Sequence, residues 1–182
     1  MKITTSHILT VLYVISWIIF VGVRIEAGGF ISNSLFTLFV NPLHAAHFWG
    51  GIDFSSLYAY DHGYFFVVTL VMSIVAVLRA VLFYQIIKIL HSKKLDLSHP
   101  FNREVGRFIS IMSYIALFIG FQSSMGVKYV QHLVMQGVKL PDIQNLRLGG
   151  ADVWLFMGVT LLVIAQIFKR GIEMQTENEL TV

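Results

Sequence analysis

The sequence predicts an all-α integral membrane protein, built as a four-helix bundle with a compact extracytoplasmic cap. Hydrophobic residues make up 56% of the 182 residues and charged residues only 13%, whereas a soluble domain carries about 25% charge. The apolar residues also gather in four long segments and do not alternate with polar ones as barrel strands do. The chain length suits a single membrane domain, residues 1–182.

Each apolar segment, with its flanking residues, is long enough to cross a bilayer, which takes about 20 residues. The apolar runs are Ile8–Val23, Tyr64–Leu90, Phe108–Val127 and Leu148–Phe168. They predict spans at about 7–24, 64–90, 107–127 and 150–169. The alternative for the first run is a signal peptide. Because residues 24–28 (Arg-Ile-Glu-Ala-Gly) make a poor small-residue cleavage site, we expect an uncleaved first span.

The uneven distribution of Lys and Arg predicts the orientation. One side of the membrane would hold Lys2, Lys88, Lys93, Lys94, Arg103, Arg107, Lys169 and Arg170. The other side would hold only Arg24, Lys128, Lys139 and Arg147. Since the richer side faces the cytoplasm, we expect both termini, the connection 88–107 and the tail 169–182 to be cytoplasmic. The outer loops are then 24–63 and 128–150.

The first outer loop is too rich in aromatic residues for a disordered tether, which predicts the cap. Within it, Leu35–Val40 is predicted to form a short interfacial helix that stops at Asn41-Pro42. Aromatic residues suited to the headgroup region are Trp49, Tyr58, Tyr60 and Tyr64. In the cytoplasmic connection, Asn102 is the expected N-cap of the third span, with Glu104 in the favourable first turn.

The sequence lacks the residues that several classes of function require. The chain has no cysteine, so disulfides and thiolate chemistry are excluded, and it has no basic run that suits direct nucleic-acid binding. Phosphate loops, zinc-protease motifs and nucleophile elbows are also missing from the sequence. We therefore expect no enzyme activity and no cofactor. No acidic residue lies in the middle of a predicted span, where ion-coupled transport would normally keep one.

The seven histidines lie outside the middle of the predicted spans, which disfavours an intramembrane haem. Two interpretations stay open for the outer ones. Either His44, His47 and His62, with Asp61, hold a metal, or they are ordinary polar surface residues.

Arg79 is the one cation inside a predicted span, nine residues before Lys88. That spacing places it about 13 Å from the inner boundary at 1.5 Å per residue. Insertion at this depth costs about 2.5–3.5 kcal/mol, so such residues are candidates for function. With no mid-span carboxylate as a partner, the polar groups expected at its depth are Tyr13, Ser113 and Tyr114. Either Arg79 snorkels or bonds groups inside the bundle, or it contacts an anion or a lipid headgroup.

The tail "IFKRGIEMQTENELTV" follows the last span. Gly171 permits a break or a turn. On a helix, Glu173 and Glu177 would share one face, with Lys169 four residues before Glu173. Two interpretations stay open, a frayed continuation of the last span and a docking strip for a partner.

This tail, together with Pro100-Phe101 after the second span, resembles the family called domain of unknown function 2975, in the form found in Bacteroidota-type bacteria. The signature falls on Phe168, Lys169, Arg170, Gly171, Glu173, Gln175, Glu177, Asn178, Leu180, Thr181 and Val182. The family usually has Asp where this chain has Glu179. The resemblance implies a four-span protein of the bacterial inner membrane and supplies no activity. Family members are often encoded beside a small helix-turn-helix regulator, which implies a transcription factor as a possible partner.

We therefore expect a non-enzymatic regulatory or sensory protein whose partners are membrane lipids and a soluble protein. The predicted partner-binding residues are Pro100, Phe101, Lys169, Arg170, Glu173, Gln175, Glu177, Asn178 and Leu180. One alternative is a lipid-binding or small-molecule membrane protein, or a transporter, centred on Arg79. The other is a structural subunit of a membrane complex.

Overall fold

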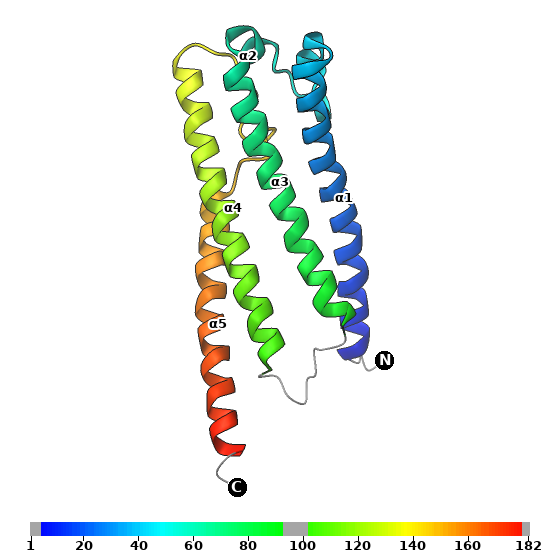
Figure 1. Ribbon diagram of the computed structural model, residues 1–182, viewed down its shortest axis with the longest axis vertical. Helices are drawn as coiled ribbons and strands as arrows, with labels where there is room; N and C mark the ends of the chain where they lie inside the picture. Colours follow the sequence, from blue (N-terminus) through cyan, green and yellow to red (C-terminus); the bar gives the residue numbers. More distant parts are fainter. Residues whose placement is uncertain (1–4, 93–101, 180–182) are drawn as a thin grey trace.

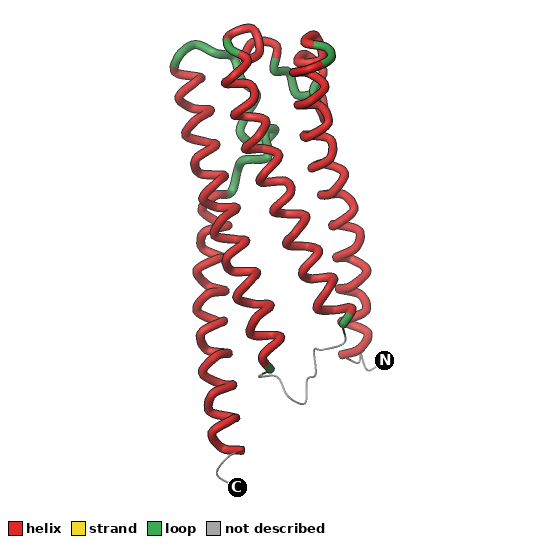
Figure 2. The backbone as a smooth tube through the Cα atoms, viewed as in Figure 1, coloured by secondary structure: helices red, strands yellow, loops and turns green. Residues whose placement is uncertain are grey.

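The computed structural model describes residues 5–92 and 102–179, and helices are the regular elements in these ranges. The long helices are α1 (Thr5–Phe39), α3 (His62–His91), α4 (Arg103–Met135) and α5 (Ala151–Glu179). The short ones are the 3-10 helices η1 (Pro42–His47) and η2 (Trp49–Gly51), and α2 (Ser55–Tyr60). All four long helices are long and apolar enough to cross a membrane. The chain is thus a multi-pass, all-α membrane protein, which confirms the predicted class (Figures 1 and 2).

The long helices pack in sequence order, α1 on α3, α3 on α4 and α4 on α5. Helix α1 begins and helix α5 ends at the same end of the bundle, which we call the terminal end (Figure 1). The opposite end carries η1, η2 and α2, which we call the cap. Within the described helices, α1 and α5 share no contact, so the row of helices is not closed into a ring.

Helix α1 is longer than the sequence predicted, because it runs through residue 24 and ends at Phe39. Residues 24–39 are therefore helix and not the start of a loop, and Leu35–Val40 is not a separate interfacial helix. The predicted stop is confirmed: the Asn41 side chain caps η1 by accepting the Leu43 N–H at 3.1 Å. Gly29 makes room for the Trp49 ring beside α1, because a side chain at this position would occupy the same space as the ring.

Side-chain caps also fix where α3 and α4 begin. The Asp61 carboxylate accepts the Tyr64 N–H at 2.9 Å at the start of α3. At the start of α4, the Asn102 side chain accepts the Val105 N–H at 2.8 Å, which confirms the predicted N-cap. Each cap satisfies one of the N–H groups that a helix start leaves without an intrahelical acceptor.

The segment 136–150 sets an offset between α4 and α5. It returns alongside α4 before α5 begins about halfway down the bundle (Figure 1). Leu148 packs against Gly126 in the upper half of α4, where an added Cβ would come within 3.1 Å of it. Because α5 starts low, its last turns extend past the first turn of α4 at the terminal end, which positions the site described below.

The cap has its own aromatic core. Phe30 of α1, Phe48, Phe54 and Phe65 of α3 are each at most 1% exposed. The Phe48 ring lies 5.1 Å from Phe54 and 6.2 Å from Phe65, both edge to face, a favoured geometry for buried rings. The cap is therefore packed like a small soluble domain, as the aromatic content of this segment predicted.

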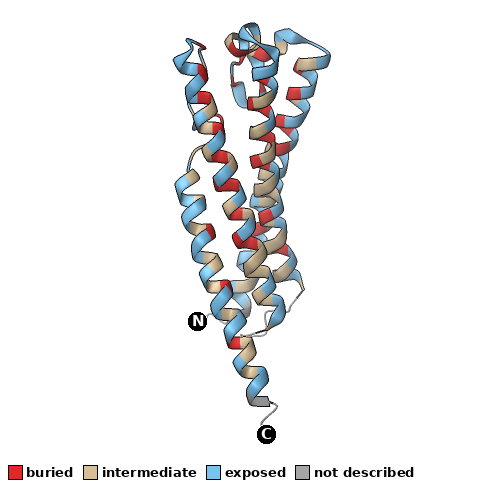
Figure 3. Ribbon diagram, turned by 60° about the vertical axis from the view of Figure 1, so that its left-hand side comes forward, coloured by how far each residue is buried: buried red, intermediate tan, exposed pale blue. Residues whose placement is uncertain are grey.

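Four hydroxyl groups on the long helices are satisfied by their own helices, whereas the buried hydroxyls of Thr37 and Ser123 have no partner in the described structure. Ser34, Thr69, Ser73 and Thr160 each donate to the carbonyl four residues earlier, at 2.6–2.9 Å. This local bonding lets a hydroxyl lie in a membrane helix without a partner on another helix. Elsewhere on the long helices, buried residues face the neighbouring helix and exposed apolar ones face outward, as for helices surrounded by lipid (Figure 3).

Candidate functional site at the terminal end

A cavity of about 510 Å³ lies between the first turns of α4 and the last turns of α5. We call it the terminal groove. Its apolar floor includes Gly106 and Ile172, and the lack of a Gly106 side chain lets Ile172 approach the α4 backbone. Its charged residues are Arg103, Arg107, Lys169, Glu173 and Glu177. The groove thus combines an apolar floor with three cations and two carboxylates.

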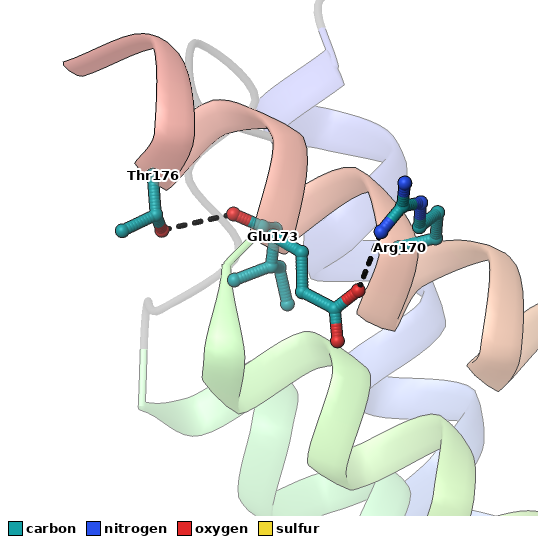
Figure 4. Close-up of polar contacts among 4 residues, drawn as sticks. Arg170, Glu173 and Thr176 are labelled. Atoms are coloured by element: carbon teal, nitrogen blue, oxygen red, sulfur yellow. Dashed lines mark hydrogen bonds and ion pairs between the residues drawn. The ribbon is translucent and has the colours of Figure 1, made fainter. Parts of the chain in front are cut away.

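The tail that lines this groove is an ordered helix. The sequence allowed a break at Gly171, but α5 continues through it to Glu179, and Gly171 is buried. A helix can pass through a glycine at a cost of about 1 kcal/mol relative to alanine. The Thr176 hydroxyl donates to the Ile172 carbonyl at 2.9 Å within this stretch (Figure 4).

Glu173 is paired with a cation other than the predicted one. Its carboxylate accepts a hydrogen bond from Arg170 at 3.2 Å, one turn earlier on α5 (Figure 4). Lys169, which the sequence placed four residues before Glu173, lines the groove without appearing in this ion pair. The Arg170 and Glu173 side chains are 66% and 43% exposed, so the pair adds at most about 1 kcal/mol to stability. Its effect is to hold Glu173 in place at the groove.

The structure brings together part of the predicted partner-binding set. Lys169, Glu173 and Glu177 line the groove, and Arg170 is held at Glu173. Gln175 lies on α5 but is not among the groove residues in the described part of the chain. The remaining predictions fall outside the description: Pro100, Phe101, Leu180 and the side chain of Asn178.

Sequence reasoning missed the α4 side of the groove. Arg103 and Arg107 were counted only as cytoplasmic cations, yet both face the tail across the cavity. Their four-residue spacing was a usable signal, because residues i and i+4 share a helix face once Asn102 is taken as the N-cap.

A second polar cluster lies higher in the bundle, around Arg79 of α3. The guanidinium carbon lies 5.7 Å from the centre of the Trp154 ring of α5. The Arg79 Nε is buried and has no hydrogen-bond partner among the described residues. The charged groups whose fields act on Arg79 are Glu26 of α1 and Arg147 of segment 136–150. These two form an ion pair of their own, with Arg147 Nε 2.8 Å from Glu26 Oε1.

This cluster differs from the polar site predicted around Arg79. The sequence offered no mid-span carboxylate, but α1 remains helical through Glu26 and brings it to this level. Tyr13 instead bonds His91, at the terminal end of α3, with its hydroxyl 3.2 Å from Nδ1. Ser113 donates to the carbonyl of Ser110. Tyr114 is 60% exposed on the surface of α4. No hydrogen bond joins any of the three to Arg79 in the described structure, so their part in a site around Arg79 stays a prediction.

Two of the cap histidines, His44 and His62, contact neighbouring side chains. His44 Nε2 lies 2.7 Å from the Asn33 side-chain oxygen, and the His62 ring lies 4.2 Å from the Tyr58 ring. Asp61 is engaged as the cap of α3. Over residues 5–92 and 102–179, no group of three or more His, Asp or Glu side chains is placed to hold a metal ion.

Comparison with known proteins gives one match. A family model described as "Protein of unknown function (DUF2975)" matches residues 41–182, which include the cap segment after α1, α3, α4 and the whole tail. No curated protein and no solved structure matches the chain.

Proposed function

Because the chain belongs to the DUF2975 family, whose description names no activity, we propose a function from the geometry: a non-enzymatic regulatory membrane protein that docks a soluble partner in the terminal groove. The observation that carries this proposal is the ordered tail. A tail that only ended the last span would have no reason to extend past α4 as a helix. Here it extends to Glu179 and, with α4, encloses a cavity of about 510 Å³.

The groove suits an amphipathic helix of a soluble protein. Such a helix buries apolar side chains in a groove and is positioned by charges along the rim. The floor at Gly106 and Ile172 offers the apolar contact. Cations line both sides of it, and the two carboxylates lie on the α5 side. Charges of both signs favour a partner with a matched pattern over a polyanion such as nucleic acid, because specificity comes from complementary charge. The small helix-turn-helix regulators suggested by the family resemblance are partners of this kind.

The proposed location is the bacterial cytoplasmic membrane, with the terminal end in the cytoplasm. The described residues at that end include Lys88, Arg103, Arg107, Lys169 and Arg170. An excess of Lys and Arg near span ends favours the cytoplasmic side. The groove would then face the compartment in which a soluble DNA-binding partner is found, and the cap would face outward.

The test is a crosslinking capture from native membranes with three forms of the chain. The groove variant is Glu173→Gln with Glu177→Gln. The matched control is Met174→Ala with Gln175→Ala, which changes the same tail at residues that do not line the groove. We expect the wild type and the control to capture one soluble DNA-binding protein, which the groove variant loses.

A second step makes the result specific. The captured protein is purified and titrated against the membrane protein in lipid nanodiscs. Loss of the two charged contacts should weaken binding by at least about tenfold, since a hydrogen bond to a charged group contributes about 1.5–3 kcal/mol. Equal affinities for the groove variant and the control would show that the groove is not the docking site.

A further inference from the structure

We call the group of Arg79, Arg147, Glu26 and Trp154 the Arg79 cluster. Its positive charges outnumber its negative charges. Glu26 and Arg147 are the charged groups that act on Arg79, so two guanidinium groups and one carboxylate leave a surplus of one positive charge among these three residues. Among the residues that line the cavity of about 420 Å³ beside Glu26 and Arg147, Asp53 is the one other acidic residue. The Asp53 carboxylate accepts the Ser55 N–H at 2.8 Å and keeps its negative charge, but it is not among the charges that act on Arg79.

Arg79 itself is incompletely satisfied. Its Nε is buried without a hydrogen-bond partner in the described structure, and the Trp154 ring offers only a cation–π contact, at 5.7 Å. A buried donor without an acceptor is expensive, and a charged one more so. Arginine presents its donors as a planar fork that matches the oxygens of a carboxylate or phosphate. An oxyanion is thus the ligand that this side chain lacks.

Arg147 adds an independent observation. It is the one non-glycine residue in the described chain with a positive φ, at 57°. This left-handed conformation is unfavourable for a residue with a side chain, and such strain is concentrated at ligand clamps and other functional sites. Here the strained backbone holds a guanidinium, 59% exposed, against Glu26. The ion pair is therefore reachable from outside, and Arg147 has donors left for a second acceptor.

The cluster is accessible from two directions. Arg79 reaches from α3 to Trp154 on α5 and lies within the field of Glu26 on α1, while α1 and α5 do not contact each other within the described helices. A lateral approach from the lipid would be from this side, where no contact between the described helices closes the bundle. The cavity beside Arg147 is a separate route from the cap.

We propose that Arg79 and Arg147, with Glu26 as their internal counter-ion, form a binding site for a phosphate oxyanion. A phospholipid headgroup would enter laterally between α1 and α5, and free phosphate would enter through the cavity beside Arg147. In either case the phosphate oxygens accept hydrogen bonds from both guanidinium groups and offset the surplus charge. This site is distinct from the terminal groove and does not depend on the proposed docking function.

The test uses the full chain, purified in a non-ionic detergent and phosphate-free buffer. Thermal unfolding is followed as three probes are added separately: dioctanoyl phosphatidylglycerol, inorganic phosphate and dioctanoylglycerol, which lacks the phosphate. Wild type should be stabilised by a phosphate-bearing probe and not by dioctanoylglycerol. Response to the lipid alone identifies a headgroup site, and response to inorganic phosphate identifies a site for the free ion.

Variants assign the response to the cluster. Arg79→Gln and Arg147→Gln should each need about 10- to 100-fold more of the effective probe, the loss expected for a hydrogen bond to a charged group. Arg24→Gln is the matched control, because it removes an exposed cation from α1 two residues before Glu26 and should respond like wild type. If Arg79→Gln does not fold, Arg147→Gln, on the exposed segment, carries the test alone. Equal probe dependence in wild type and Arg147→Gln, or an equal response to dioctanoylglycerol, would overturn the proposal.

Discussion

Two glycines on the facing sides of α4 and α5 give the sharpest prediction about what holds the bundle together. A methyl group at Gly120 would lie 2.7 Å from Leu155 Cγ and 2.9 Å from the Leu155 backbone nitrogen. A methyl group at Gly158 would meet Leu117 at the same two distances, 2.7 Å from Cγ and 2.9 Å from the nitrogen. Small residues that let helix backbones approach in this way are a common basis of helix association in membranes.

The cost of Gly120→Ala and of Gly158→Ala follows from these contacts. A rotamer change cannot move a backbone nitrogen, so the helices must separate by roughly 0.5 Å, an overpacking that typically costs about 1–3 kcal/mol. Alanine recovers about 0.5–1 kcal/mol, because glycine is the less stable residue in a helix. We expect a net loss of about 0.5–2 kcal/mol for each variant. The double variant should lose less than the sum, since the helices need to separate only once.

The assay is thermal unfolding in detergent, followed by tryptophan fluorescence, with Gly22→Ala and Gly28→Ala as controls. Both control glycines lie on α1 with no neighbouring atom within 4 Å of an added Cβ, so alanine there should stabilise by about 0.5–1 kcal/mol. A shift of about 2–4 °C per kcal/mol is typical at this chain length. The two pairs of variants should therefore move in opposite directions. If Gly120→Ala unfolds at or above the temperature of Gly28→Ala, the close approach of α4 and α5 is not what the structure shows.

Three further predictions concern single local features. Asn102→Ala should destabilise by about 1 kcal/mol through loss of the α4 N-cap, with faster amide hydrogen exchange confined to the first turn of α4. The Ser55 side chain and backbone N–H lower the pKa of Asp53. The contribution of Asp53 to stability is therefore present above the ordinary Asp pKa and is lost as pH falls through the lowered value. Asp53→Asn should flatten the acid limb of a plot of stability against pH, and an unchanged limb would contradict this. Arg147→Gly should be more stable than Arg147→Ala, because both lose the ion pair to Glu26 and only glycine relieves the positive φ of 57°; equal unfolding temperatures would argue against backbone strain there.

The spans were predictable from the sequence because composition and length alone decide them. The local stop at Asn41-Pro42 and the cap at Asn102 were also predictable, since each depends on one side chain and the backbone beside it. The end of the first helix was not. Charges at Arg24 and Glu26 indicate a membrane boundary when only neighbours are considered, whereas Glu26 is paired with a residue 121 positions away.

Part of the terminal groove could likewise be predicted from the sequence, and part could not. The shared face of Lys169, Glu173 and Glu177 followed from helical spacing, and all three line the groove. Their opposite wall at Arg103 and Arg107 depends on how far α5 is displaced along α4. That displacement is set by segment 136–150, whose path has no periodic signal in the sequence. Helix faces could thus be predicted, and the pairing of faces required the structure.

Helix α5 connects the two polar sites physically. Trp154, in its first turn, contacts Arg79, and Glu173 lines the terminal groove. Glu173 follows Trp154 by 19 positions, which is about 28 Å of helix at 1.5 Å per residue. Gly158 lies between the two, at the close contact with α4, so any movement of α5 that couples the two proposed sites must pass this contact.

If both proposed sites exist and α5 couples them, binding must be reciprocal: phosphate should change partner affinity by the same factor as the partner changes phosphate affinity. Gly158→Ala should alter that factor without touching either ligand, because it changes how α5 rests on α4. The measurement is a phosphate-probe titration with and without saturating partner, repeated in Gly158→Ala and in the control Gly28→Ala. A coupling factor of one in the wild type would show that α5 carries two independent sites. A factor above one that Gly158→Ala leaves unchanged would place the coupling outside the α4–α5 contact.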